Sequence, residues 1–206
     1  MATLQFTETP ILQHPAQILI LPVNNAGIIL DPVIARCKTL YPDNYQRYRK
    51  ACMDGQLQVG SSFLVKRQRD HAGLSASSNG NRPNHIANLV VCDHPYHPTR
   101  RAWLNSALDA LKAQLFELMR YEGIHSAALL ARPLIYPSLN KDPSISTFDS
   151  SQLSPLSSTQ LSTPPSAELN APVLEWHKDI MPLLEQKLSD LPKLRIDIHL
   201  PKNLTT

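Results

Sequence analysis

Residues 16–27 read AQILILPVNNAG, an apolar run that leads directly into a loop with two asparagines and a glycine. The run from Ile18 to Val23 has no polar side chain, so it predicts a β-strand that is buried on both faces. Strands of this kind occur in parallel sheets that helices cover on both sides. The loop from Asn24 to Gly27 then follows the carboxyl end of the strand.

The segments around this stretch alternate between strand and helix patterns. Asp31 and Pro32 supply an N-cap and a proline at the first helical position, while Gly55 and Gly123 end two further helices. We expect strands at residues 4–6, 62–65, 86–91, 127–131 and 194–200, and helices at residues 33–40, 42–54, 98–122 and 173–190. This order predicts an α/β fold, a three-layer α/β/α sandwich with a mainly parallel mixed sheet, in a single domain that spans residues 1–206.

Two polar segments interrupt the pattern. Residues 68–84 are rich in Ser, Asn, Gly and Arg and have no apolar periodicity, so we expect a mobile polar loop. Residues 137–172 are rich in Ser, Thr, Pro and Gln. Such a segment buries too little apolar surface to offset its ordering entropy, and we therefore expect a disordered or loosely draped insertion.

Composition restricts the class of partner and the cellular compartment that we expect for the protein. The 206 residues are 42% hydrophobic with a formal net charge of +3, which is too weakly basic by itself to indicate nucleic-acid binding. No signal peptide and no run of about 18 apolar residues occurs. The three cysteines form no CxxC pair and are expected to be reduced. We expect a cytoplasmic protein without a membrane segment, a cofactor or a metal site.

The order of several short motifs resembles one branch of the macro-domain family. They read LYPDNY at residues 40–45, CMDGQLQVG at 52–60, MPLLE at 181–185 and LSDLP at 188–192. Macro domains of that branch likewise have a buried strand ending in Val-Asn, a tyrosine-proline between two helices, and a cysteine followed by two glycines. The branch includes antitoxins that remove ADP-ribose from DNA. The resemblance covers most of residues 4–200 apart from the two polar segments.

The resemblance implies that the first loop binds ADP-ribose and that Asn24 orients the distal ribose. The ligand-binding residues of this loop would be Val23, Asn24, Asn25, Ala26 and Gly27.

Three ligand positions depart from the family pattern. The acidic residue that recognises adenine in the family is replaced in the segment Thr9–Ile11, where Pro10 offers neither a carboxylate nor an N–H. The glycine-rich turn before the first helix is replaced by Leu30–Pro32, and no glycine follows Gly123. Arg132 is therefore a candidate for phosphate contacts, because its planar guanidinium matches phosphate oxygens. The alternative is an arginine at a solvated strand end.

Candidates for catalysis lie after the strand at residues 86–91. Cys92 stands near the position of a catalytic lysine in the DNA-directed branch, and it is either a nucleophile with a depressed pKa or a buried thiol. His94, with His97 beside it, is either an acid or base near neutral pH or a solvated loop histidine. Together with Asn24, Cys92 and His94 are the predicted catalytic residues.

A local excess of basic residues provides a candidate nucleic-acid interface. Its members are Arg67, Arg69, Arg100 and Arg101. If the polar loop folds over the cleft, these side chains can contact a nucleic-acid backbone; the alternative is an ordinary solvated surface.

Three functions follow from the resemblance. The first is an antitoxin-like ADP-ribosyl glycohydrolase that acts on DNA or protein. The second is a non-catalytic binder of ADP-ribose or a related nucleotide. The third is an inactive domain that serves as a protein-interaction or immunity module against a toxin. The expected partners are thus ADP-ribose, and either DNA or a toxin.

Overall fold

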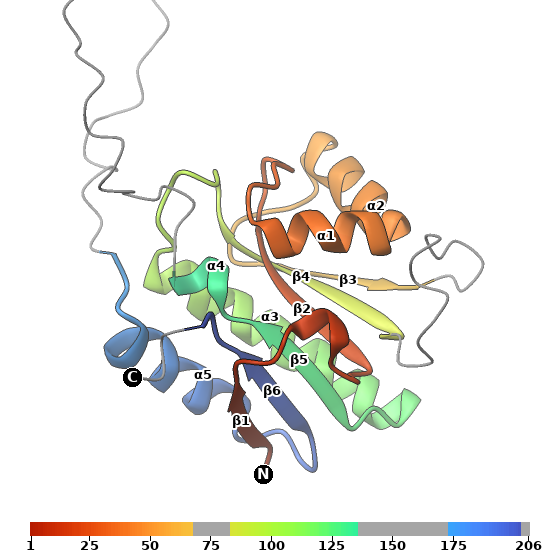
Figure 1. Ribbon diagram of the computed structural model, residues 1–206, viewed down its shortest axis with the longest axis vertical. Coiled ribbons are helices and arrows are strands. Elements are labelled where there is room, and N and C mark those ends of the chain that lie inside the picture. Colours follow the sequence, from red (N-terminus) through yellow and green to blue (C-terminus); the bar gives the residue numbers. More distant parts are fainter. Residues whose placement is uncertain (68–82, 136–172, 203–206) are drawn as a thin grey trace, which may run out of the picture.

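A computed structural model describes residues 1–67, 83–135 and 173–202 (Figure 1). The six strands form one sheet with the order β1-β6-β5-β2-β4-β3. Their bounds are β1 Thr3–Thr7, β2 Ile18–Asn24, β3 Ser62–Lys66, β4 His85–Cys92, β5 Ser126–Leu130 and β6 Arg195–His199. The pairs between neighbours are parallel except β3 with β4, which is antiparallel at the edge. The predicted mainly parallel mixed sheet is confirmed.

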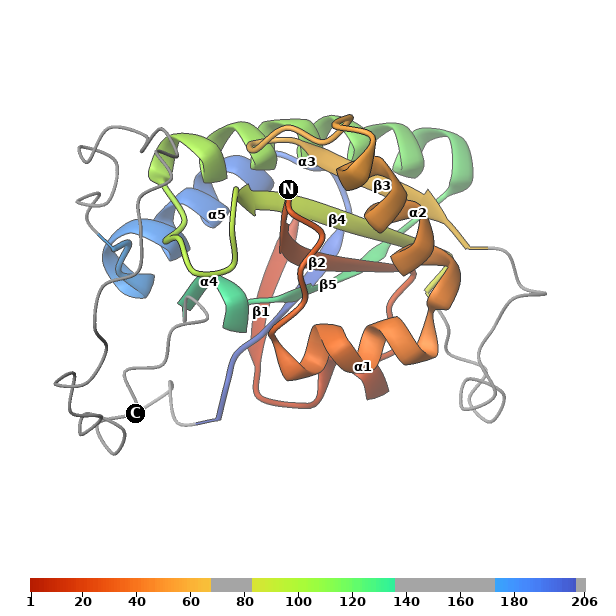
Figure 2. The ribbon, with the colours of Figure 1, turned by 90° about the horizontal axis from the view of Figure 1, so that it is seen from above.

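Helices cover both faces of the sheet. They are α1 Pro32–Leu40, α2 Pro42–Met53, α3 Arg101–Glu122, α4 Arg132–Ile135 and α5 Met181–Leu188, with short turns η1 Ile11–Gln13 and η5 Trp176–Ile180. Figure 2 shows α3 and α5 along one face and α1 along the other. The three-layer prediction is therefore confirmed, although α4 was not expected and the last predicted helix is divided into a π-helical turn and α5.

The central strand β2 explains the two-sided core. All seven of its residues are buried, because successive side chains point to opposite faces and both faces are covered. Ile18 and Ile20 pack with α3 and α5 in one apolar cluster. Leu19 and Leu21 pack with α1 and α2 in the other. The continuous apolar run in the sequence is thus the strand that joins both halves of the core.

Sequence signals for the helix ends agree with the structure. The Asp31 side chain accepts hydrogen bonds at the start of α1, and Gly123 ends α3 with a positive φ of 66°. The predicted insertion at residues 137–172 and all of the predicted polar loop except residues 83 and 84 lie outside the described residues. Within the described part of the chain, no helix has the length and apolar character needed to cross a membrane.

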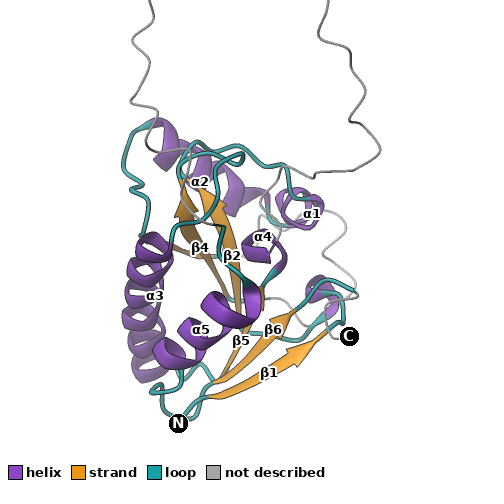
Figure 3. Ribbon diagram, turned by 90° about the vertical axis from the view of Figure 1, so that its left-hand side faces the viewer, coloured by secondary structure: helices purple, strands orange, loops and turns teal. Residues whose placement is uncertain are grey.

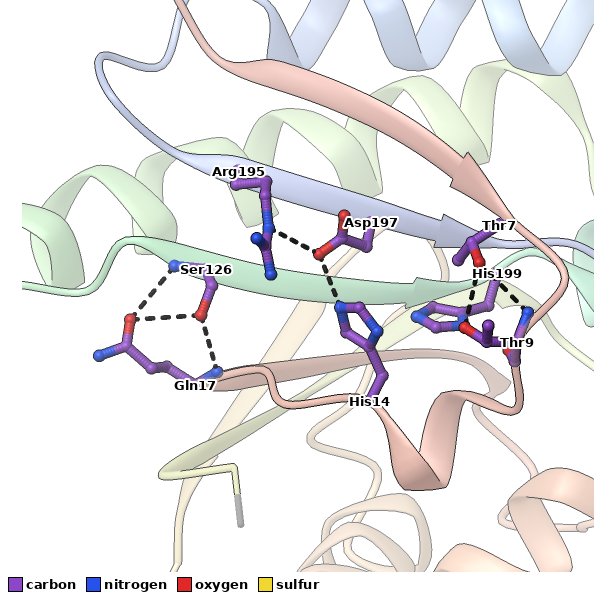
Figure 4. Close-up of polar contacts among 8 residues, drawn as sticks. All are labelled: Thr7, Thr9, His14, Gln17, Ser126, Arg195, Asp197 and His199. Carbon is purple, nitrogen blue, oxygen red and sulfur yellow. Dashed lines mark hydrogen bonds and ion pairs between the residues drawn. The ribbon is translucent and has the colours of Figure 1, made fainter. Parts of the chain in front are cut away.

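The segment between β1 and β2 is tied across the face of β6 by polar contacts (Figure 4). Arg195, Asp197 and His199 alternate along β6 and point to this face, opposite to Ile196 and Ile198, which pack in the α3 and α5 cluster. This arrangement leaves three polar side chains for the incoming segment.

Asp197 and His199 hold that segment at its two ends. His14 Nε2 lies 2.7 Å from Asp197 Oδ2, which Arg195 Nε also contacts at 3.0 Å. His199 Nδ1 donates to the carbonyl of Thr9 at 2.7 Å, since a carbonyl oxygen can only accept. Figure 3 shows β6 and β1 together at the edge of the sheet that lies away from α2.

Candidate functional site

A cleft that is partly open to solvent lies at the carboxyl ends of β2 and β4. The loop after β2, the loop after β4 and the start of α4 form its walls. Its lining residues are Pro22, Val23, Asn24, Ile28, Ile29, Leu30, Asp31, Ile34, Val91, Cys92, Pro95, His97, Thr99 and Pro133. The lining is mainly apolar with a few polar groups, as is usual for small-molecule sites.

A break in strand pairing positions Asn24. Val23 pairs with Val90, but Asn24 pairs with Cys92, so Val91 on β4 is skipped. An irregularity of this kind re-aims a side chain at the end of a strand. Asn24 is buried and its amide bonds the Ile28 backbone twice, donating from Nδ2 at 2.7 Å and accepting at Oδ1 from N–H at 3.2 Å. The Tyr48 hydroxyl also lies 3.5 Å from Oδ1, so one donor hydrogen at Nδ2 remains for a further partner.

Helix α2 contacts the same loop through Tyr48 and Cys52. The Tyr48 hydroxyl donates to the Asn24 carbonyl, and Cys52 lies beneath Gly27. Gly27 has φ 72°, a backbone conformation that favours glycine, whereas a Cβ there would only be in ordinary contact with Cys52 Cβ at 3.4 Å. Asn25, Ala26 and Gly27 stand in this turn but do not line the cleft.

Asp31 lines the cleft and pairs with Arg132, which directly precedes the lining residue Pro133. Asp31 Oδ1 accepts the amides of Val33 at 2.8 Å and Ile34 at 3.1 Å. Its other oxygen, Oδ2, accepts Arg132 Nη1 at 3.0 Å. The Asp31 side chain is only 10% exposed, against 34% for Arg132. Arg132 is therefore bound to a carboxylate of its own chain.

Cys92 lines the cleft as a neutral thiol. Burial, with a smaller effect from the charge of Asp93, raises the pKa of Cys92 to about 12. A nucleophilic cysteine needs an accessible thiolate, which a nearby positive charge or helix N-terminus normally stabilises. Burial and the negative charge of Asp93 instead disfavour the thiolate of Cys92. This favours the alternative that Cys92 is a buried thiol.

The loop after β4 places its two histidines differently relative to the cleft. His97 lines the cleft, whereas His94 does not, although the two ring centroids are only 5.5 Å apart. The His94 ring is tilted against Tyr96 at a ring-centroid distance of 5.1 Å. His97 Nδ1 lies 2.9 Å from Asp93 Oδ1. Burial acts to raise the pKa of Asp93, but its hydrogen bond and charge interaction with His97 outweigh this, so the pKa is lowered. The resulting pair is an aspartate that orients a histidine at the cleft.

Of the four arginines proposed for nucleic acid, the three that the structure describes lie at two different ends of β4. Arg67 follows β3 at the level of the first residues of β4, and its side chain donates to the Pro83 carbonyl. Arg100 and Arg101 follow the opposite end of β4, on the side of the cleft. The eight residues of β4 span roughly 26 Å at about 3.3 Å a residue. Arg69 lies outside the described residues.

Within the described ranges, no group of three or more His, Cys, Asp or Glu side chains has the arrangement of a metal site.

A DNA ADP-ribosyl glycohydrolase of Thermus aquaticus is 33% identical over 115 residues, which are 56% of this chain and 29% of that protein. A protein of the same name from Mycobacterium tuberculosis is 27% identical over 119 residues, or 58% of this chain and 30% of that protein. The chain therefore spans less than a third of the length of these relatives. No family model matches the chain.

Solved structures cover nearly the whole chain. The macrodomain of Thermus aquaticus DarG has a TM-score of 0.65 and 21% identity over 98% of this chain and 100% of that chain. The chain has the macro-domain fold. Thermosipho africanus DarTG, solved in complex with ADP-ribose, has a TM-score of 0.63 and 21% identity over 97% of this chain and 42% of that chain. The fold predicted from the first loop is thus confirmed, and the likeness is to the DarG branch.

Two features of this macro-domain site were not found from the sequence. The bond between Tyr48 and Asn24 joins residues 24 positions apart. The ion pair of Asp31 with Arg132 spans 101 positions. No local pattern signals either contact, because each depends on how α1, α2 and α4 pack around the end of β2.

Proposed function

We propose that this chain binds ADP-ribose in the cleft between the loops after β2 and β4 and removes it from DNA. The observation that carries the proposal is the position of that cleft in a macro-domain fold, formed by the loop that begins with Asn24. The names of the relatives, DNA ADP-ribosyl glycohydrolase, support the reaction, and the ADP-ribose complex of Thermosipho africanus DarTG supports the ligand.

In this proposal, Val23 and Asn24, the two residues of the first loop that line the cleft, contact the distal ribose. The Asn24 amide, already fixed by Ile28, uses its remaining Nδ2 hydrogen on a ribose hydroxyl. Arg132 contacts the diphosphate. The adenine end lies toward Thr9–Ile11, the segment that His199 holds against β6.

Acid and base chemistry falls to His97 rather than to Cys92 or His94. His97 lines the cleft, and its Nδ1 is oriented by Asp93, which leaves Nε2 for the reacting groups. In the hydrolysis, water replaces DNA at the ribose carbon, and the proton that water loses is passed to the departing DNA. An imidazole has one ring nitrogen that can accept a proton and another that can donate one, so His97 is suited to carry this proton.

The DNA strand is proposed to leave the cleft along Arg100 and Arg101, next to Thr99 in the lining. Arg100 lies over the Trp103 ring at 4.4 Å, and Arg101 pairs with Asp179 at 3.2 Å, so both side chains are oriented near the cleft. Removal of ADP-ribose from DNA would suit an antitoxin-like role, with the modifying toxin as a further proposed partner.

The test combines binding and release. Isothermal titration with ADP-ribose measures binding, and an ADP-ribosylated oligonucleotide measures release of ADP-ribose. We expect Asn24→Ala to lower affinity and His97→Asn to lower kcat more than tenfold with a small change in KM. His94→Asn is the matched control, since His94 is in the same loop but outside the cleft, and it should change kcat less than twofold.

The remaining outcomes identify the alternatives. Binding of ADP-ribose without release from DNA or protein would indicate a non-catalytic nucleotide binder. A folded protein that shows no heat at millimolar ADP-ribose and no release would leave only the protein-interaction module.

A further inference from the structure

The carboxylate of Asp31 occupies the two kinds of contact that an anion would use in this cleft. It accepts two backbone amides at the start of α1 and the Nη1 group of Arg132, all within 3.1 Å. Amides at a helix start and a guanidinium are the usual partners of phosphate oxygens. The side chain lines the cleft and is nine-tenths buried, so it is part of the wall that a ligand meets.

This arrangement makes a ligand phosphate a competitor of Asp31 for the Nη1 group of Arg132. A diphosphate that approached Arg132 with Asp31 in place would bring two negative groups together in a partly buried site, where like charges repel strongly. Arg132 is the first residue of the four-residue helix α4, and its side chain is one-third exposed. It is therefore open to solvent on one side and can exchange one anion for another.

We propose that Asp31 is a specificity-determining residue that competes with the ligand for Arg132. When a ligand with a diphosphate enters, Arg132 moves from the carboxylate to a phosphate oxygen, and Asp31 withdraws from the cleft. The carboxylate thereby lowers the affinity of the site for simple anions. A ligand displaces it from Arg132 only when other parts of that ligand also bind to the cleft. This inference rests on the proposed function for the identity of the ligand, but not for the competition itself.

The decisive variant is Asp31→Asn. Asparagine caps helices as well as aspartate does, so the start of α1 keeps an acceptor while the competing charge is lost. Isothermal titration of the full chain with inorganic pyrophosphate should show binding at least tenfold tighter in Asp31→Asn than in the wild type. The gain should disappear in the double variant Asp31→Asn with Arg132→Gln, because Arg132 is the group released.

Asp179→Asn is a matched control. Asp179 also combines a backbone amide, that of Glu175 at 3.0 Å, with an arginine, Arg101 at 3.2 Å, but it does not line the cleft. Its pyrophosphate affinity should stay within twofold of the wild type. An equal gain in Asp179→Asn would mean that net charge alone raises anion binding, and this would overturn the proposal.

Two probes keep this inference separate from the proposed function. Pyrophosphate tests the competition, and ADP-ribose tests the ligand. A folded Asp31→Asn protein, with an unchanged circular dichroism spectrum, that binds pyrophosphate no better than the wild type overturns the inference even if ADP-ribose binds. If pyrophosphate binding improves as expected but no variant binds ADP-ribose, the competition stands and the proposed ligand is wrong.

Discussion

Asp31 and Asp197 are two carboxylates with nearly the same chemistry in two different places. Each is largely buried, with 10% and 4% of the side chain exposed, and each contacts an arginine at 3.0 Å. Asp31 lines the cleft at the end of β2, whereas Asp197 lies in the middle of β6, under the segment that carries His14. The difference lies in what can reach them.

A partner of Asp31 can be replaced by a ligand, because the cleft opens onto it. Asp197 is enclosed by His14 and Arg195 and does not line the cleft, so its contacts serve only to hold residues 9–14 on the sheet (Figure 4). We therefore expect substitutions at Asp197 to act mainly on stability, and those at Asp31 to act mainly on ligand affinity. The following predictions test this contrast, from the largest expected effect to the smallest.

Asp197→Ala should lower the free energy of unfolding by about 3 kcal/mol. The reason is that the largely buried His14 ring loses the carboxylate that contacts its Nε2 atom. Urea unfolding followed by circular dichroism measures the change. Arg195→Ala, which removes the more exposed partner, should cost less than about 1 kcal/mol. A loss of similar size in both variants would show that the contact with Arg195, rather than the contact with His14, accounts for the stabilisation by Asp197.

Asp31→Ala should lower the free energy of unfolding by about 1 kcal/mol, the usual cost of losing an N-cap side chain. Asp31→Asn, which retains an acceptor, should remain within about 0.5 kcal/mol of the wild type. The same urea titration applies to both. A larger loss in Asp31→Asn than in Asp197→Ala would reverse the contrast and make Asp31 the structural residue.

The sheet and its layers could be predicted because they depend on short-range patterns. The apolar run Ile18–Val23, the cap at Asp31 and the stop at Gly123 each lie within a few residues of the feature that they determine. The pairing of Asp197 with His14 could not be predicted in this way. It links residues 183 positions apart and depends on the strand order, which places β6 beside the segment that follows β1.

For the cleft, the sequence could predict which loops form it but not which of their side chains line it. Parallel strands bring their carboxyl ends to one edge, so the sequence could group Asn24 with Cys92 and the two histidines. It could not choose between His94 and His97, because the turn at Pro95 and Tyr96 decides which ring lines the cleft. Nor could it show that Arg132 is already paired, since that contact requires α4, a helix of four residues with no amphipathic pattern.

The tie between His199 and Thr9 should make stability depend on pH. Burial lowers the pKa of His199 below 6.5, with the neighbouring His14 acting in the same direction and Thr9 and Asp197 against it. His199 Nε2 is buried and has no hydrogen-bond partner among the described residues, so a proton there is not stabilised. Burial also lowers the pKa of His85. A neutral histidine is thus favoured in the fold.

The sign of the effect follows from these two groups. Their stabilisation is fully present above pH 6.5 and is lost as the pH falls from 6.5 through the folded pKa values, where the unfolded chain binds the extra protons. His199→Asn keeps a donor for Thr9 and should reduce the slope between pH 7 and 5 by less than about 1 kcal/mol per pH unit, with the slope from His85 remaining. His177→Asn, at an exposed position of η5, should leave the slope unchanged. An unchanged slope in His199→Asn would show that this tie does not titrate.

Cys92→Ser should have the smallest effect, and it distinguishes lining the cleft from acting in it. Cys92 shares the cleft with Asp31, but burial raises the pKa of its thiol to about 12, so the thiolate is almost absent at pH 7. Serine has nearly the same size and cannot replace a thiolate nucleophile at this pH. If the thiol only lines the wall, release of ADP-ribose from a modified oligonucleotide should stay within about twofold of the wild type, since the transition-state contacts are unchanged. Cys52→Ser, beneath Gly27 and outside the cleft, is the matched control for a general effect of the substitution. A loss of a hundredfold or more in Cys92→Ser alone would restore the nucleophile hypothesis and would require the cleft to gain a positive charge near Cys92 when the ligand binds.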